Sequence, residues 1–166
     1  WKEYNLIVEK LAIKIHESGF KPTMLIGIMR GGAPIIDVLS RIFKLKCAYL
    51  AVESYTGTGV EDQQGELVFS REMSSTVQNM GGRLLLCDDL SDTGITLNKS
   101  VDWLKKYPPI KDNIESIKTA VLWKKAASTF EPDFCAERLK DNPWIVQPFE
   151  NYEEVRIEDL LKKHKK

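Results

Sequence analysis

The sequence predicts an α/β protein with a mostly parallel, twisted sheet flanked by helices. Short apolar runs alternate along the chain with longer segments in which apolar residues recur at helical spacing, a pattern typical of α/β folds. Two runs, residues 24–29 and 84–87, are continuously apolar and too short for helices, as expected of strands buried on both faces. The length of 166 residues corresponds to about one domain, so we expect residues 1–166 to form a single unit.

The composition argues against several classes of partner. Lysine plus arginine and aspartate plus glutamate each number 24, so no net charge favours nucleic acid or an acidic membrane surface. Cys47, Cys87 and Cys135 are scattered without C-x-x-C spacing, which argues against disulfides and structural zinc. No apolar run approaches about eighteen residues and no signal-peptide pattern opens the chain, so a cytoplasmic protein without a membrane partner is expected.

The N-terminal segment predicts a packing helix that ends near Gly19. One face of this helix carries the apolar residues Tyr4, Ile7, Val8, Leu11, Ala12 and Ile15. His16 and His164 are the only histidines, so a histidine metal site is not expected.

The run of residues 24–29 leads into the loop Arg30-Gly31-Gly32-Ala33-Pro34 and then into a segment with helical spacing. Pro34 suits the first position of this helix. The open amides of the glycines and the cation of Arg30 suit a pyrophosphate group. Taken alone, the R-G-G sequence is equally compatible with ordinary turn glycines.

Residues 47–53 and 67–70 are expected to be strands on either side of a long polar loop, residues 54–66. Loops of this length within compact domains are often lids over a reacting centre, and an idle surface hairpin is the alternative.

Residues 83–100 form the central element of the predicted fold. The apolar run ends in Asp88 and Asp89, which are expected to face the ligand because ligands lie at the carboxyl ends of parallel strands. A polar turn follows and opens the next helix. Its hydroxyls, its glycine and its backbone N–H groups suit an anionic phosphate; the residues concerned are Ser91, Asp92, Thr93, Gly94, Ile95 and Thr96.

This turn favours a monophosphate over other phosphate ligands. It lacks the lysine of a nucleoside-triphosphate P-loop, and the chain contains no G-x-G-x-x-G. Asp88 and Asp89 are suited to accept hydrogen bonds from ribose hydroxyls or to help hold Mg²⁺. Such an acid pair, taken alone, is more often a solvated loop, and Asp92 a helix N-cap.

The helix that follows the turn is expected to stop at Pro108-Pro109, before a strand over residues 117–123. Lys124 comes directly after this strand, where it can donate a hydrogen bond to a ligand carbonyl, and Lys125 is the competitor for that role. Residues 130–156 do not continue the alternation of apolar strands and amphipathic helices. We therefore expect them to form a small hood over the strand ends of a core made of residues 1–129. The tail, residues 155–166, is expected to be a short amphipathic helix.

Within the hood, the sequence NPWIVQPFE of residues 142–150 contains two candidates for contact with a base. Trp144 offers a flat apolar face, and Ile145 can present its backbone to the edge of the base. A buried core tryptophan is the alternative interpretation.

Four stretches, in order from residue 24 to residue 150, resemble the motifs of the type I phosphoribosyltransferases. The sequence LLLCDDLSDTGITL of residues 84–97 is similar to the phosphoribosyl-pyrophosphate (PRPP) motif of that family. Residues 142–150 resemble a segment of bacterial and archaeal xanthine-guanine and hypoxanthine phosphoribosyltransferases. Val146 departs from this pattern, because some relatives carry an acid there, and it leaves open which oxopurine is preferred.

The resemblance implies transfer of 5-phosphoribose from PRPP to a 6-oxopurine base, with release of pyrophosphate and assistance from Mg²⁺, in purine salvage. It implies that Asp92 is the catalytic carboxylate beside purine N7, and that Asp89, or alternatively Asp88, binds the metal. It also implies a homo-oligomer, either a dimer or a tetramer. The remaining implied contacts are Arg30, Gly31, Gly32, Asp88, Asp89 and Ser91 to Thr96 for PRPP, Ser54 and Tyr55 in the flexible loop, and Lys124, Trp144 and Ile145 for the purine.

Two alternatives remain, one from another class of protein and one with another acceptor. A PRPP-sensing regulatory protein would use the same fold, but the neutral charge balance and the presence of Lys124 and Trp144 argue against it. Transfer to adenine or orotate is disfavoured by Lys124, since the amino group of adenine would place a donor against a donor.

Overall fold

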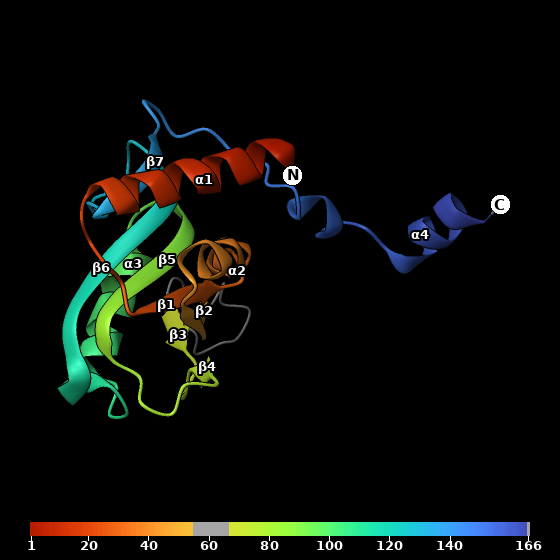
Figure 1. The fold of residues 1–166 in the computed structure, drawn as a ribbon. Coiled ribbons are helices and arrows are strands. Elements are labelled where there is room, and N and C mark those ends of the chain that lie inside the picture. The colour runs from red at the N-terminus through yellow and green to blue at the C-terminus, as the bar shows by residue number, and fades with distance from the viewer. Residues whose placement is uncertain (55–66, 166) are drawn as a thin grey trace, which may run out of the picture.

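The computed structural model describes residues 1–54 and 67–165 (Figure 1). In these ranges the elements are α1 (Lys2–Glu17), β1 (Met24–Met29), α2 (Gly32–Phe43), β2 (Lys46–Ser54), β3 (Leu67–Phe69), β4 (Ser74–Ser75), β5 (Gly82–Ser91), α3 (Ile95–Lys106), η1 (Lys111–Asn113), β6 (Ile114–Lys124), β7 (Phe134–Arg138), η2 (Glu150–Tyr152) and α4 (Ile157–His164). No helix in the described part of the chain is long and apolar enough to cross a bilayer.

The strands form one mostly parallel sheet, which confirms the predicted fold class. Their order is β3-β2-β1-β5-β6-β7, with β4 beside β2. The pairs β1–β2, β1–β5, β5–β6 and β6–β7 are parallel, whereas β3 and β4 pair with β2 in antiparallel fashion. The carboxyl ends of β1, β5 and β6 therefore lie side by side at one edge of the sheet.

Helices cover both faces of the sheet. Side chains of α1 and α2 pack with Leu85 and Cys87 on one face, and those of α3 pack with Leu84 and Leu86 on the other. Figure 1 shows α1 lying across the sheet near β6 and β7. This alternation explains why the central strand is continuously apolar, since each of its faces meets a hydrophobic layer.

Several element boundaries differ from the prediction, in the long central strands because backbone pairing continues beyond the apolar runs. The strand predicted over residues 84–87 is the longer β5, which pairs with β6 as far as Ser91 and Lys124. Asp88 and Asp89 thus lie within a strand, and Lys124 is the last residue of β6. Helix α2 begins at Gly32, so Pro34 is its third residue, a position whose N–H also lacks an intrahelical partner.

The predicted hood is wrong in one part. Phe134–Arg138, expected to leave the α/β pattern, forms β7, which extends the sheet in parallel beside β6. Cys135 and Ala136 of β7 are buried, so packing against the sheet decides this segment. Beyond β7 the chain passes the N-terminus of α1, and Figure 1 shows α4 projecting away from the body.

Candidate active site

The candidate site is built at the edge of the sheet where β1, β5 and β6 end. Arg30 and Gly31 follow β1, Asp88 and Asp89 lie near the end of β5, and Lys124 ends β6. Because these parallel strands are neighbours, three stretches far apart in sequence converge.

The glycines after β1 let this loop touch β5. A Cβ atom at Gly31 would lie 2.4 Å from the carboxyl carbon of Asp89, and one at Gly32 would lie 2.4 Å from the carbonyl oxygen of Cys87. Any larger residue would separate the two strands' ends. The Met29–Arg30 peptide bond is cis.

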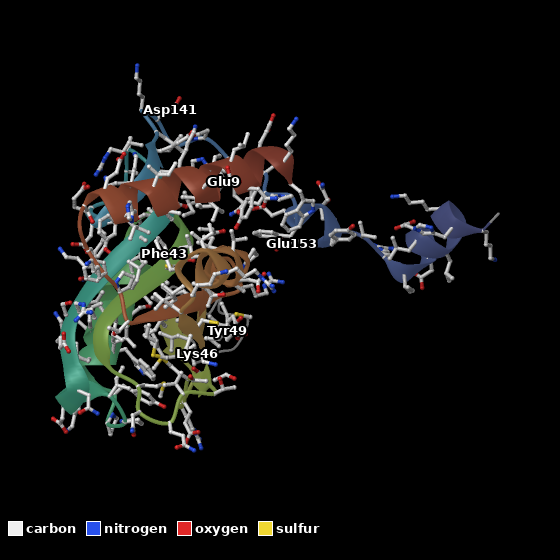
Figure 2. The ribbon with its side chains drawn as sticks, in the orientation of Figure 1. Glu9, Phe43, Lys46, Tyr49, Asp141 and Glu153 are labelled. Carbon is white, nitrogen blue, oxygen red and sulfur yellow. The ribbon has the colours of Figure 1, made fainter. Side chains whose placement is uncertain are left out.

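Arg30 itself reaches toward the C-terminal segment, residues 139–165, which follows β7. Its Nη2 atom lies 3.1 Å from Oε1 of Glu153, and its side chain is 85% exposed. Glu153 lies where the C-terminal segment leaves the body (Figure 2). The ion pair is exposed and therefore weak, so the guanidinium is available to an anionic ligand.

Asp88 and Asp89 occupy different environments although they are adjacent. Asp88 is 8% exposed, and its Oδ1 accepts a hydrogen bond of 3.0 Å from the backbone N–H of Asp89. Burial and the neighbouring Asp89 carboxylate raise the pKa of Asp88 well above its usual value. Asp89 is half-buried and accepts a hydrogen bond from the side-chain amide of Gln147.

The turn between β5 and α3 is shaped to present backbone N–H groups. Gly94, the N-cap of α3, has a φ of 87°, and a Cβ there would meet Phe130 at 2.3 Å. Thr93 and Asp92 are exposed. Ser91 is buried, and its hydroxyl lies 2.7 Å from that of Ser128, so this hydroxyl supports the turn from inside. Ile95 and Thr96 open α3, where the first N–H groups lack helical acceptors.

Two lysines stand at the end of β6, Lys124 as its last residue and Lys125 directly after it. Nζ of Lys124 donates to the carbonyl oxygen of Ser128 at 3.0 Å. Nζ of Lys125 lies 3.2 Å from Oδ1 of Asp92, and the Lys125 side chain is only 8% exposed. The structure thus pairs Lys125, rather than Lys124, with the proposed catalytic carboxylate.

The residues predicted to contact the base and to form the flexible loop differ in their exposure. Trp144 is 82% exposed, which excludes the buried-core alternative for it in this conformation. Ile145 is half-buried and packs against the core. Ser54 ends β2, and the rest of the expected loop, Tyr55 included, lies outside the described residues.

A cavity of about 530 Å³ joins the glycine loop and β5 to the C-terminal segment. Its lining includes Arg30, Gly31, Asp89, Glu150 and Glu153. The sequence pattern predicts no role for Glu150, Glu153 or Gln147. Only their proximity to Trp144 and Ile145 in the chain could have suggested one.

The arrangement can hold a polyanion that carries hydroxyl groups. The cavity offers Arg30 and the glycine loop after β1 for phosphates and the Asp89 carboxylate for hydroxyl donors, and the turn after β5 adds the first N–H groups of α3. Comparison with protein-family descriptions matches residues 1–154 to the Phosphoribosyl transferase domain.

The chain belongs to the phosphoribosyl transferase family. It is a phosphoribosyltransferase with the type I fold that the sequence motifs predict. No curated protein sequence matches the chain significantly.

Solved structures of phosphoribosyltransferases share the fold. A purine phosphoribosyltransferase from Pyrococcus horikoshii is 28% identical, with 90% of each chain covered and a TM-score of 0.70. A Helicobacter pylori xanthine-guanine-hypoxanthine phosphoribosyltransferase is 21% identical, with 99% of this chain and 96% of that chain covered and a TM-score of 0.69. An orotate phosphoribosyltransferase from Aeropyrum pernix is 17% identical, with 84% and 73% covered and a TM-score of 0.61.

Proposed function

We propose that this phosphoribosyltransferase transfers 5-phosphoribose from PRPP to a nitrogen of a 6-oxopurine and releases pyrophosphate. The observation that carries the proposal is the convergence of Arg30, Asp89, the turn before α3 and Lys124 at one edge of the sheet. The Pyrococcus horikoshii protein, described as a purine phosphoribosyltransferase, supports a purine acceptor.

Each part of PRPP has a matching part of the site. The turn from Asp92 to Thr96 would hold the 5′-phosphate through the N–H groups of α3 and the Thr93 hydroxyl. Asp88 and Asp89 would accept hydrogen bonds from the ribose hydroxyls. The loop of Arg30, Gly31 and Gly32 would hold the pyrophosphate by charge and by open amides.

The donor set also fits Mg²⁺, which takes oxygen ligands and commonly combines one or two carboxylates with water and substrate phosphates. Asp89 lines the 530 Å³ cavity beside Arg30 and is the proposed metal ligand, with Asp88 as the alternative. When bound, Mg²⁺ would neutralise charge on the pyrophosphate. Among the described residues, no group of three or more histidine, cysteine or acidic side chains forms a complete cage, so substrate oxygens would complete the site.

In this reaction the protein mainly has to position the two substrates and stabilise the charge that develops on them. The anomeric carbon gains positive character as the C–O bond to pyrophosphate breaks, and the purine nitrogen must lie in line with that bond. Asp92 is the proposed carboxylate that exchanges a proton with purine N7. Nζ of Lys125, 3.2 Å from Oδ1 of Asp92, would hold this carboxylate in a fixed orientation at the turn.

Lys124, Trp144 and Ile145 are the proposed contacts for the base. Lys124 would donate to O6 of the purine, in exchange for its present bond to the carbonyl oxygen of Ser128. The exposed ring of Trp144 is free to stack on a base, because no core packing holds it. We further propose that the protein acts in purine salvage in the cytoplasm as a homo-oligomer.

A screen of radiolabelled bases tests the proposal. With PRPP and Mg²⁺, we expect transfer to hypoxanthine, guanine or xanthine and little transfer to adenine or orotate. The orotate arm matters because the fold is shared with the Aeropyrum pernix orotate phosphoribosyltransferase. Transfer to orotate alone would overturn the purine assignment, and absence of any transfer would overturn the reaction.

The two lysines provide the matched test of the base site. Lys124→Ala should lower kcat/KM for the 6-oxopurine. The expected loss corresponds to about 1.5–3 kcal/mol of transition-state stabilisation, the range for hydrogen bonds to charged groups. Lys125→Ala should act instead through Asp92 and lower kcat for every base. If only Lys125→Ala changes the choice of base, the two roles are exchanged.

A further inference from the structure

Gln147 connects the C-terminal segment to the central strand. It lies in the sequence NPWIVQPFE, is 3% exposed, and donates a hydrogen bond from Nε2 to Oδ2 of Asp89 on β5. Its carbonyl oxygen, Oε1, is buried and has no hydrogen-bond partner among the described residues. Nothing in the sequence pattern assigns this side chain a role.

Gln147 is buried at this contact, whereas Asp89 is half-buried and lines the cavity. The hydroxyl of Tyr4, from α1, is also buried without a partner in the described part of the chain. Burial, followed by the nearby carboxylates of Asp89 and Asp88, raises the pKa of Tyr4. Hydrogen bonds to a carboxylate are stronger where water is excluded, so the bond from Gln147 is expected to fix the orientation of Asp89.

Asp89 is held from two sides. The backbone of Gly31 lies against its carboxyl group on one side, so closely that a Cβ at Gly31 would lie 2.4 Å from the carboxyl carbon, and Gln147 binds it from the other. The same carboxylate lines the cavity that contains Arg30. A change in the C-terminal segment would therefore move or release a group that faces the ligand.

We propose that Gln147 is a positioning residue that holds the Asp89 carboxylate in the orientation that binds the ribose hydroxyls and Mg²⁺ of PRPP. The inference rests on the proposed function, since it assigns the ligand of Asp89. Gln147 is only two residues from Ile145, a span of at most about 7 Å, so the segment proposed to bind the base is tied to the sugar site.

This connection has a thermodynamic consequence. Binding of PRPP to Asp89 restrains Gln147 and with it the neighbouring base contacts, so PRPP and base should strengthen each other's binding through this residue. The effect must be reciprocal, because coupling between two sites is a property of both.

A double-mutant cycle tests whether Gln147 acts through Asp89. Gln147→Met keeps the side chain's length but removes the donor, and it should raise the Kd for PRPP with Mg²⁺, measured by calorimetry without base, about tenfold. The KM for PRPP should rise by a similar factor, with kcat within about threefold of the parent. In an Asp89→Ala background the same substitution should change the Kd less than twofold, because the partner is gone.

The controls separate positioning from general stability. Lys140→Met, at an exposed residue of the same C-terminal segment, should leave the Kd unchanged. If Gln147→Met raises the Kd equally with and without Asp89, its role is structural and the proposal is overturned. An unchanged Kd overturns it as well.

A second measurement does not require a Gln147 variant to fold. In Asp89→Ala, amide hydrogen exchange of residues 142–150 should be faster than in the parent, because the segment has lost its attachment to β5. Unchanged exchange there would overturn the proposal. If the parent binds PRPP but transfers 5-phosphoribose to no purine, only the purine assignment fails, since calorimetry tests Gln147 without a base.

Discussion

We expect Asp92 to act in the chemical step, and Asp88 and Asp89 to act mainly in binding PRPP. Asp92 is exposed at the turn after β5 and lies 3.2 Å from Lys125, whereas Asp88 and Asp89 lie within the strand. Because general acid–base assistance is worth about 10²–10⁴ in rate, Asp92→Asn should lower kcat by that factor with little change in PRPP affinity. Steady-state kinetics across pH, with calorimetry of PRPP, measure both quantities.

Asp89→Asn is the matched comparison for this substitution. It should raise the KM for PRPP as well, because it removes charge from the carboxylate that faces the ribose. A kcat for Asp92→Asn within a few-fold of the parent at every pH would mean that Asp92 only caps the turn.

Asp88 should make the protein's stability depend on pH. Burial and the Asp89 carboxylate raise the pKa of Asp88, so the folded state keeps a proton that the unfolded state releases. The free energy of unfolding should therefore fall as pH rises from about 4 through the raised pKa. An amide is neutral at every pH, so Asp88→Asn escapes this cost and should be about 1–3 kcal/mol more stable than the parent at pH 7–8 without Mg²⁺.

Urea unfolding from pH 4 to pH 8, in the presence of a chelator, measures this difference. The parent and Asp88→Asn should be nearly equal at pH 4 and diverge as pH rises. Parallel curves would show that Asp88 ionises normally in the folded protein.

At the scale of elements, the close approach of the β1 loop to β5 should be needed for PRPP binding. Gly31→Ala places a Cβ into the carboxyl group of Asp89, although the φ of −61° at Gly31 itself tolerates alanine. We expect the KM for PRPP to rise at least about tenfold and stability to fall by about 1–3 kcal/mol, the usual effect of overpacking. Kinetics and thermal unfolding measure the two effects.

Gly19→Ala is the control for this substitution. Gly19 follows α1 with a φ of 76°, and nothing lies within 4 Å of a Cβ there. Alanine should reduce stability by about 1–2 kcal/mol through backbone strain but leave the KM unchanged. A KM for Gly31→Ala that matches the control would mean that the loop can move without harm to the site.

For the whole molecule, the sheet and its two hydrophobic layers should fold without α4. None of the residues of α4 is buried, so removal of residues 157–166 should change the melting temperature by less than about 2 °C. A truncation before β7, which removes the buried Cys135 and Ala136, should instead prevent cooperative unfolding. A fall of more than about 5 °C on removal of α4 would show that this helix packs in solution, against its own chain or a second copy.

Local sequence patterns were enough to predict the α/β class, the central strand with its turn, the glycine loop and the position of Lys124. These features are local: an unbroken apolar run implies burial on both faces, and a glycine or a pair of acids at its end implies a ligand edge. The N-terminal helix was predicted for the same reason, from the spacing of its buried residues, among them Tyr4, Val8 and Leu11.

Features that depend on partners distant in sequence could not be predicted in this way. β7 forms because β6 offers an edge to pair with, and the long β5 because β6 continues its ladder to Ser91. Lys125 and Asp92, which form an ion pair, are separated by 33 positions in the sequence. Gln147 and Asp89, which share a hydrogen bond, are separated by 58 positions. No local pattern encodes such contacts, since their geometry is set by how neighbouring strands and the C-terminal segment pack together.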